Sequence, residues 1–185
     1  MSPIPIRRAR NARAPVAFVI ALFVAAIPVR AAATPSISLP ALPAALDPGD
    51  LKPYLMVTAD GVQIYVCGKT DGGTWTWTFK APEANLFDAA GSKVGRHYAG
   101  PTWEGFDGGK VVGNVKASAE APVADAIAWL RLDIKAREGT GAFTQAAGVL
   151  RVSTAGGKAP GAGCDQTHAG TELRVPYMAS YVFLK

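Results

Sequence analysis

The sequence predicts an all-β, single-domain protein built as an antiparallel β-sandwich, with a jelly-roll-like fold or a barrel as the alternative. Three observations favour this class. All 20 glycines of the 185-residue chain lie after residue 48, and glycine-rich turns are typical of β structure. About ten short apolar runs lie between these turns. Nearly all of these runs lack helical periodicity, which favours packed antiparallel strands over helices.

The first 33 residues have the pattern of a secretory signal peptide. Residues 1–14 contain four arginines and no acidic residue, and the 15 residues of Pro15–Val29 carry no charge. This apolar run is shorter than the about 20 residues that a membrane-spanning helix needs. Three alanines follow at positions 31–33, and small residues of this kind form the site that signal peptidase cleaves. We expect Sec-dependent export, cleavage after Ala33, and a periplasmic or extracellular protein with no stable membrane span.

The same leader holds all of the excess positive charge. The chain has 19 Lys and Arg against 14 Asp and Glu, a net charge of +5. Five arginines lie within residues 1–33, so residues 34–185 carry 14 basic and 14 acidic side chains. A nucleic-acid-binding domain needs basic residues clustered on its folded part. The charge pattern therefore predicts no nucleic-acid partner.

Residues 34–53 contain five prolines and little hydrophobic periodicity. Proline lacks the backbone N–H that helix interiors and central strands need, so we expect an extended lead-in that lies on the domain surface or stays mobile. The β domain is expected from residue 54 to residue 185.

The first expected element of this domain is a hairpin with strands at Leu55–Ala59 and Val62–Cys67. Asp60-Gly61 between the two apolar runs predicts a tight turn, because both central residues of such a turn must accept a positive φ. The next strand, Thr74–Phe79, alternates threonine with aromatic residues and so places three rings on one face. Further strands are expected at Leu86–Phe87, Val94–Ala99, Thr102–Glu104, Val111–Ala117, Phe143–Thr154, Leu173–Val175 and Ser180–Leu184.

Residues 124–137 fit both a helix and a strand by composition, because they are rich in good helix formers. Apolar residues alternate there with Trp129 and with charged side chains. This alternation favours a strand with one solvated face. It also makes Trp129 the most exposed of the four tryptophans.

The chain has two cysteines, Cys67 and Cys164. An even number of cysteines in an exported protein predicts a disulfide, with two buried free thiols as the alternative. Neither cysteine has a second Cys or a His at the spacing of a zinc finger.

A run of thirteen residues around a Gly-Pro bend holds the densest group of chemically active side chains. The binding hypothesis assigns a small molecule or glycan to His97, Tyr98, Trp103 and Glu104. The two aromatic rings would form a platform for such a ligand. The enzyme hypothesis, a hydrolase or a metal-dependent enzyme, uses His97, Glu104 and Asp107 for proton transfer or metal binding. The third hypothesis is a structural, envelope-associated protein, in which the rings are core and Asp107 begins a turn.

The sequence lacks the motifs of common nucleophile and cofactor sites. It contains no G-x-S-x-G elbow, no P-loop spacing, and no G-x-G-x-x-G that follows a strand and opens a helix. The two histidines, His97 and His168, allow at most a mixed metal site completed by a carboxylate. We therefore predict no cofactor and no metal, and we leave open whether the protein is an enzyme.

Several segments together resemble domain-of-unknown-function family 3455, a group of secreted bacterial and fungal proteins. These segments are Gly61–Cys67, Ala81–Leu86, His97–Glu104, Ala126–Leu130, Gly163–Asp165 and Val175–Tyr177. The resemblance covers most of residues 50–185. It implies no activity, and the malate-dehydrogenase label of some fungal members is not supported here because the dinucleotide motif is missing. It directs attention to the two cysteines and to His97–Glu104.

Overall fold

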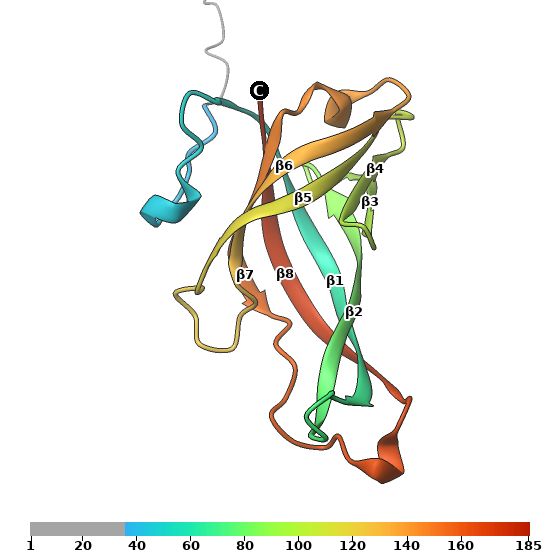
Figure 1. Ribbon diagram of the computed structural model, residues 1–185. Helices are drawn as coiled ribbons and strands as arrows, with labels where there is room; N and C mark the ends of the chain where they lie inside the picture. The colour runs from blue at the N-terminus through green and yellow to red at the C-terminus, as the bar shows by residue number, and fades with distance from the viewer. Residues whose placement is uncertain (1–35) are drawn as a thin grey trace, which may run out of the picture. The chain divides into compact units, whose positions relative to one another are not determined.

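The computed structural model describes residues 36–185. The predicted signal peptide, residues 1–33, lies outside these described residues. Eight antiparallel strands are joined in chain order and close into a barrel when the last strand pairs with the first (Figure 1). Within the described part, no helix is long and apolar enough to span a membrane.

The strands are β1 (Pro53–Lys69), β2 (Trp75–Phe87), β3 (Lys93–Tyr98), β4 (Thr102–Gly105), β5 (Lys110–Ala119), β6 (Trp129–Glu138), β7 (Gly148–Gly156) and β8 (Glu172–Leu184). Three short 3-10 helices accompany them, η1 (Ala44–Leu46), η2 (Ala142–Gln145) and η3 (Gln166–His168). The predicted all-β antiparallel class is confirmed, in the barrel form that the sequence offered as the alternative to a sandwich.

The predicted hairpin turn at Asp60-Gly61 is wrong, because β1 runs straight through both residues. Gly61 pairs with Ala84 of β2 on one side and with Tyr177 of β8 on the other. A Cβ at position 61 would lie 2.2 Å from the carbonyl oxygen of Glu83. Glycine is needed here because the backbone of β2 approaches too closely for a side chain. From the sequence alone, a glycine required by the close approach of two strands cannot be distinguished from a glycine required by a turn.

Two further pairs of expected strands are also continuous, so three mergers in all reduce the eleven expected strands to eight. β2 joins the expected strands at Thr74–Phe79 and Leu86–Phe87 through Pro82. β8 likewise runs through Pro176. Proline is unfavourable inside a strand because it lacks the N–H of the ladder, but pairing with β1 keeps both segments extended, so tertiary context overrides the local signal.

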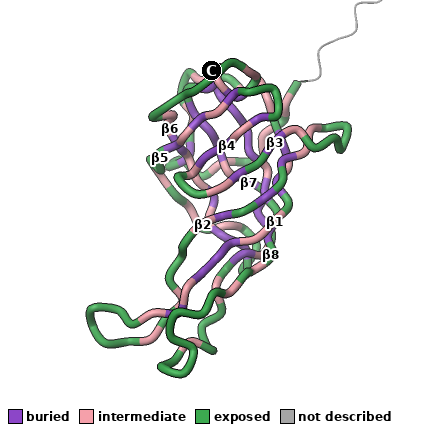
Figure 2. The backbone as a smooth tube through the Cα atoms, turned by 90° about the vertical axis from the view of Figure 1, so that its right-hand side faces the viewer, coloured by how far each residue is buried: buried purple, intermediate pink, exposed green. Residues whose placement is uncertain are grey.

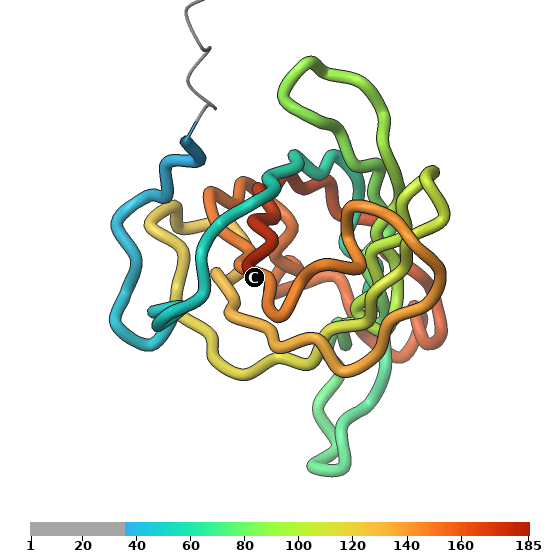
Figure 3. The backbone as a smooth tube through the Cα atoms, turned by 90° about the horizontal axis from the view of Figure 1, so that it is seen from above, coloured from blue at the N-terminus to red at the C-terminus, as the bar shows by residue number. Residues whose placement is uncertain are grey.

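Residues 124–137 contribute a strand and not a helix, as the alternation predicted. The expected exposure of Trp129 is wrong, since 5 % of this residue is accessible. Trp129 belongs to an apolar cluster on the outer face of the barrel, which the lead-in covers with Ile37, Leu39, Leu42 and Leu46. Figure 3 shows this segment in blue beside the yellow part of the chain. The five prolines of the lead-in conceal an apolar surface that packs on β6.

The barrel interior is most tightly packed at the end where η2 lies. Figure 2 shows the buried positions in purple, gathered in the upper, closed part of the barrel, while the loops at the lower end are exposed. Phe183 of β8 stacks on Phe143 of η2, with ring centroids 4.6 Å apart, and meets Trp103 of β4 edge-on at 6.0 Å. These rings close one end of the barrel.

The close approach at Gly61 gives the first testable prediction. Gly61→Ala should lower the free energy of unfolding by about 3 kcal/mol, because the new Cβ overlaps the backbone of β2. Gly68→Ala is the matched control on the same strand, since a Cβ there meets nothing within 4 Å. We expect a change within about 0.5 kcal/mol for this control in urea unfolding. Equal stability of the two variants would contradict the continuous strand.

Candidate functional site

The residues singled out by the sequence lie on β3 and β4, which form a hairpin. His97 pairs with Trp103 across this hairpin, and Arg96 pairs with Glu104. Successive side chains of a strand point to opposite faces of the sheet. The hairpin therefore divides the predicted group, with His97 and Trp103 inside the barrel and Tyr98 and Glu104 outside.

The inner half is packed core. His97 is 2 % exposed and Trp103 is fully buried, and their rings stack with centroids 4.7 Å apart. Nδ1 of His97 lies 2.8 Å from the carbonyl oxygen of Thr102, so this nitrogen carries the proton and donates it. The centroid of the Tyr181 ring, in the barrel interior, lies 4.7 Å from that of the His97 ring.

Burial lowers the pKa of His97 from 6.5 to about 3, because desolvation disfavours the charged ring. The hydrogen bond to Thr102 opposes this shift, and the positive charge of Arg151 adds to it. His97 is therefore neutral near pH 7 and is enclosed among aromatic rings. This environment suits a structural role for the histidine better than proton transfer.

Asp107 lies apart from both His97 and Glu104. Its carboxylate accepts hydrogen bonds from the backbone N–H of Gly109 at 3.1 Å and of Ala142 at 2.7 Å. It thereby holds the turn between β4 and β5 against η2. The three residues of the enzyme hypothesis thus occupy the barrel interior, its outer face and a turn.

The outer half of the group lines an open cleft of about 560 Å³ over β1, β2, β3, β4 and β8. Its lining includes His97, whose side chain is buried, and the polar residues Asp60, Glu83, Asn85, Arg96, Tyr98, Glu104 and Arg174. The Glu104 carboxylate is the centre of a small network, since Oε2 accepts from the Tyr98 hydroxyl at 3.1 Å and from Arg96 at 3.0 Å. Arg174 pairs with Glu83 at 3.0 Å nearby.

Tyr98 remains a hydrogen-bond donor in this network. Burial raises the pKa of its hydroxyl, and the hydrogen bond to Glu104 and the charge of that carboxylate raise it further. The ion pairs of the cleft are exposed to solvent, so they add little to stability. The cleft therefore offers fixed donors, acceptors and one aromatic ring without a large excess of either charge.

Sequence reasoning missed most of the cleft. Arg96 could have been found, since it lies two residues before Tyr98 on one strand and therefore on the same face. Asp60, Glu83 and Arg174 come from β1, β2 and β8. Their approach depends on pairings between distant segments, which no local pattern reveals.

The two histidines do not form the mixed metal site that the sequence allowed. His97 lies inside the barrel, whereas His168 is exposed on η3 and contacts the Asp165 carboxylate at 2.8 Å. Among residues 36–185, no three side chains of His, Cys, Asp or Glu gather closely enough to hold a metal ion.

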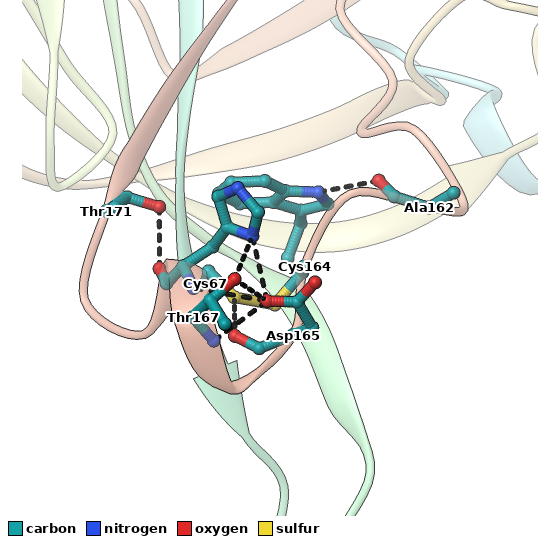
Figure 4. The surroundings of a disulfide bond; sticks show 8 residues. Cys67, Ala162, Cys164, Asp165, Thr167 and Thr171 are labelled. Carbon is teal, nitrogen blue, oxygen red and sulfur yellow. Dashed lines mark hydrogen bonds and ion pairs between the residues drawn. A yellow bond between two sulfur atoms is a disulfide. The ribbon is translucent and has the colours of Figure 1, made fainter.

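The predicted disulfide between Cys67 and Cys164 is confirmed, with Cα atoms 5.3 Å apart (Figure 4). It joins the end of β1 to the long connection between β7 and β8. Asp165 caps η3 by accepting from the backbone N–H of Thr167 at 2.8 Å. Trp77 of β2 donates from Nε1 to the carbonyl oxygen of Ala162 at 3.0 Å. These contacts hold the connection against the strands.

The folded part of the chain matches a known family. The model of the family described as "Protein of unknown function (DUF3455)" matches residues 48–185. This range includes all eight strands and both cysteines. No curated protein and no solved structure matches the chain.

The buried histidine predicts a loss of stability in acid. A histidine whose folded pKa is depressed takes up a proton more readily when unfolded, so its contribution is complete above pH 6.5 and falls as the pH drops toward 3. Between pH 7 and pH 4.5, His97 should account for about 3 kcal/mol of the decrease in unfolding free energy. Urea unfolding at the two pH values measures it.

His97→Phe keeps an aromatic ring beside Trp103 and removes the titrating group. The unfolding free energy of this variant should therefore decrease by about 3 kcal/mol less between pH 7 and pH 4.5 than that of the wild type. His168→Phe, at the exposed histidine, controls for the loss of a histidine as such and should retain most of the decrease. An undiminished decrease in His97→Phe would contradict the assignment.

Proposed function

The chain belongs to the DUF3455 family, as its sequence motifs predicted, and we propose that it is an exported protein that binds a small polar molecule or glycan in the outer cleft. One observation carries this proposal. Tyr98 and Glu104, two residues of the predicted group, meet Arg96 in a hydrogen-bonded network on the wall of a 560 Å³ cleft. Binding sites combine such a concavity with a few convergent polar groups.

The chemistry of the cleft suits a neutral ligand with several hydroxyl groups. Carboxylates of Asp60 and Glu104 accept hydrogen bonds, while the guanidinium groups of Arg96 and Arg174 donate them. The ring of Tyr98 can pack against an apolar ring face. Since the charged groups of both signs are interspersed, no strong field selects an anion or a cation.

The inner pair has a positioning role in this proposal. His97 and Trp103 stack directly behind the hairpin that carries Tyr98 and Glu104. Their packing and the bond from His97 to Thr102 fix the register of β3 against β4. Trp103 is fully buried, so ligand stacking in the cleft falls to Tyr98 alone.

Export is proposed on two grounds. The first 33 residues have the pattern of a signal peptide, and a disulfide links Cys67 to Cys164. Disulfides persist in oxidising compartments such as the periplasm and the extracellular space. The hydrolase or metal-dependent alternative is not carried forward, because His97, Glu104 and Asp107 do not converge.

A binding screen tests the cleft. The exported protein is titrated with neutral mono- and disaccharides and with polyols, and binding is followed by calorimetry. For the ligand that binds, Glu104→Gln should weaken affinity about tenfold or more, because an ionised acceptor is lost from the network. Asp133→Asn removes an exposed carboxylate from the ion pair with Lys116 outside the cleft and should leave affinity unchanged. A flat screen, or equal effects of the two variants, would favour the structural, envelope-associated role instead.

Export is tested separately by expressing the full chain with its own leader in a bacterial host. We expect a periplasmic or secreted product whose mass is that of a chain beginning at residue 34. Its cysteines should resist alkylation until the disulfide is reduced. Deletion of residues 15–29 removes the apolar run and should keep the protein in the cytoplasm. A full-length cytoplasmic product with two free thiols from the intact gene would refute the proposal.

A further inference from the structure

A second pocket lies at the other end of the barrel, away from η2 and from the outer cleft. Its volume is about 350 Å³. In Figure 1 the connections between β5 and β6 and between β7 and β8 leave the barrel at this lower end. The pocket wall is formed by Tyr65, Phe79, Ile127 and Leu130, and its polar floor by Gln63 and Arg151. The neutral cleft proposed above shares none of these residues.

Arg151 brings a positive charge to the barrel interior. On β7 it pairs with Leu130 of β6 and with Tyr181 of β8, both of which contribute to the interior cluster. Its Nε and one Nη donate to a single carbonyl oxygen, that of Ala128, at 3.0 and 2.8 Å. None of the ion pairs found within residues 36–185 includes Arg151. The guanidinium also interacts with the Tyr181 hydroxyl, but its charge has no acidic partner among these residues.

The positive charge of Arg151 affects the titratable groups around it. Arg151 acts to lower the pKa of Tyr65, His97 and Tyr181, although burial is the largest cause of the shift in each of the three. The Arg151 side chain is half-buried, so its charge is screened less than that of an arginine in water. An anion that enters this region gains more from Arg151 than it would from an arginine in water.

Gln63 is an independent sign of a missing partner. It is 2 % exposed, it lines the pocket, and its Nε2 makes no well-formed hydrogen bond among the described residues, although the Tyr177 hydroxyl lies within its reach. Leaving a buried amide donor unpaired destabilises the folded protein. Such groups in folded proteins call for an explanation, of which an absent ligand is one.

The local backbone is also shaped for this pocket. β7 carries an irregularity between Val152 and Ala155 in its pairing with β8, and Ser153 within it has a φ of 51°. Positive φ is unfavourable for a residue other than glycine, and bulges often occur next to functional sites. Thr154 donates to the carbonyl oxygen of Ile127 at 2.6 Å. Together with the bonds from Arg151, this clamps the segment 126–128 over the pocket.

The remaining wall is apolar. Tyr65 and Phe79 meet edge-on with centroids 5.7 Å apart, and Phe79 is 52 % exposed. At the rim, Lys158 lies 3.5 Å from Glu120, and both side chains are well exposed. An exposed ion pair of this kind is weak. Glu120, the one acidic residue that lines the pocket, therefore does not neutralise the charge of Arg151 at its floor.

We propose that this pocket is a second binding site, which takes a small carboxylic acid with an apolar body. The carboxylate would accept hydrogen bonds from Arg151 and Gln63, and the body would lie against Tyr65, Phe79 and Ile127. Arginine is well suited to carboxylates, because its planar donors match the two oxygens. The proposal stands independently of the outer cleft.

Calorimetric titration of the exported protein with octanoate and benzoate tests this site, with octanamide and benzamide as neutral counterparts. We expect saturable binding of at least one acid and at least tenfold weaker binding of its amide. Arg151→Gln should weaken acid binding about tenfold or more. Arg137→Gln is the matched control, since Arg137 also donates to carbonyl oxygens, those of Thr144 and Ala146, and lies outside the pocket. The Arg137→Gln variant should bind the acid with the same affinity as the wild type.

Arg151 also holds the segment 126–128, so its replacement could unfold the protein. Gln63→Glu provides the second variant, because it places a carboxylate of the same size beside Arg151 and should itself block the acid while circular dichroism shows a folded barrel. Absence of binding by both acids, equal binding of an acid and its amide, or wild-type affinity in a folded Gln63→Glu protein would each overturn the proposal.

Discussion

Strand β1 pairs with β2 along one edge and with β8 along the other, and at Gly61 it passes so close to β2 that no Cβ fits between them. The closure of the barrel depends on this contact, because β8 reaches β1 only if β1 stays extended through the same point. Alternation then distributes the neighbours of Gly61 between two faces. Asp60 faces the outer cleft, and Gln63 faces the inner pocket. Both candidate sites are therefore consequences of one close backbone approach.

The interior of the barrel changes character along its axis. At the end closed by η2 the aromatic rings of Trp103, Phe143 and Phe183 pack against each other, and the Trp103 Nε1 is also buried without a hydrogen-bond partner among the described residues. Toward the other end lie Gln63 and Arg151, whose donors outnumber the acceptors that the described residues supply. His97 lies among the rings, and there burial keeps it neutral. A stable core alone could be made of apolar residues at both ends of the barrel. The polar residues at this end therefore call for an explanation other than stability.

Local patterns predicted what depends on local geometry. Apolar runs between turns predicted β3 and β4, alternation predicted β6, and the even cysteine count predicted the disulfide. The same reasoning failed where distant segments meet. Gly61 was read as a turn because its constraint comes from β2, and Trp129 was expected in water because the cover comes from a proline-rich lead-in. The floor of the inner pocket was missed for the same reason, since its residues belong to strands far apart in the chain.

The family match begins at residue 48 and so includes the cleft, the inner pocket and the disulfide, but not Leu46 of the lead-in, which is fully buried. The polar groups of both sites cost stability, because an unpaired buried donor and a desolvated cation replace contacts that apolar side chains would make. Other parts of the chain offset this cost. The disulfide closes a loop of 97 residues and restricts the unfolded chain, and the lead-in removes the apolar outer face of β6 and its neighbours from water. A fold supported in this way from outside its barrel can keep polar, incompletely paired groups within it.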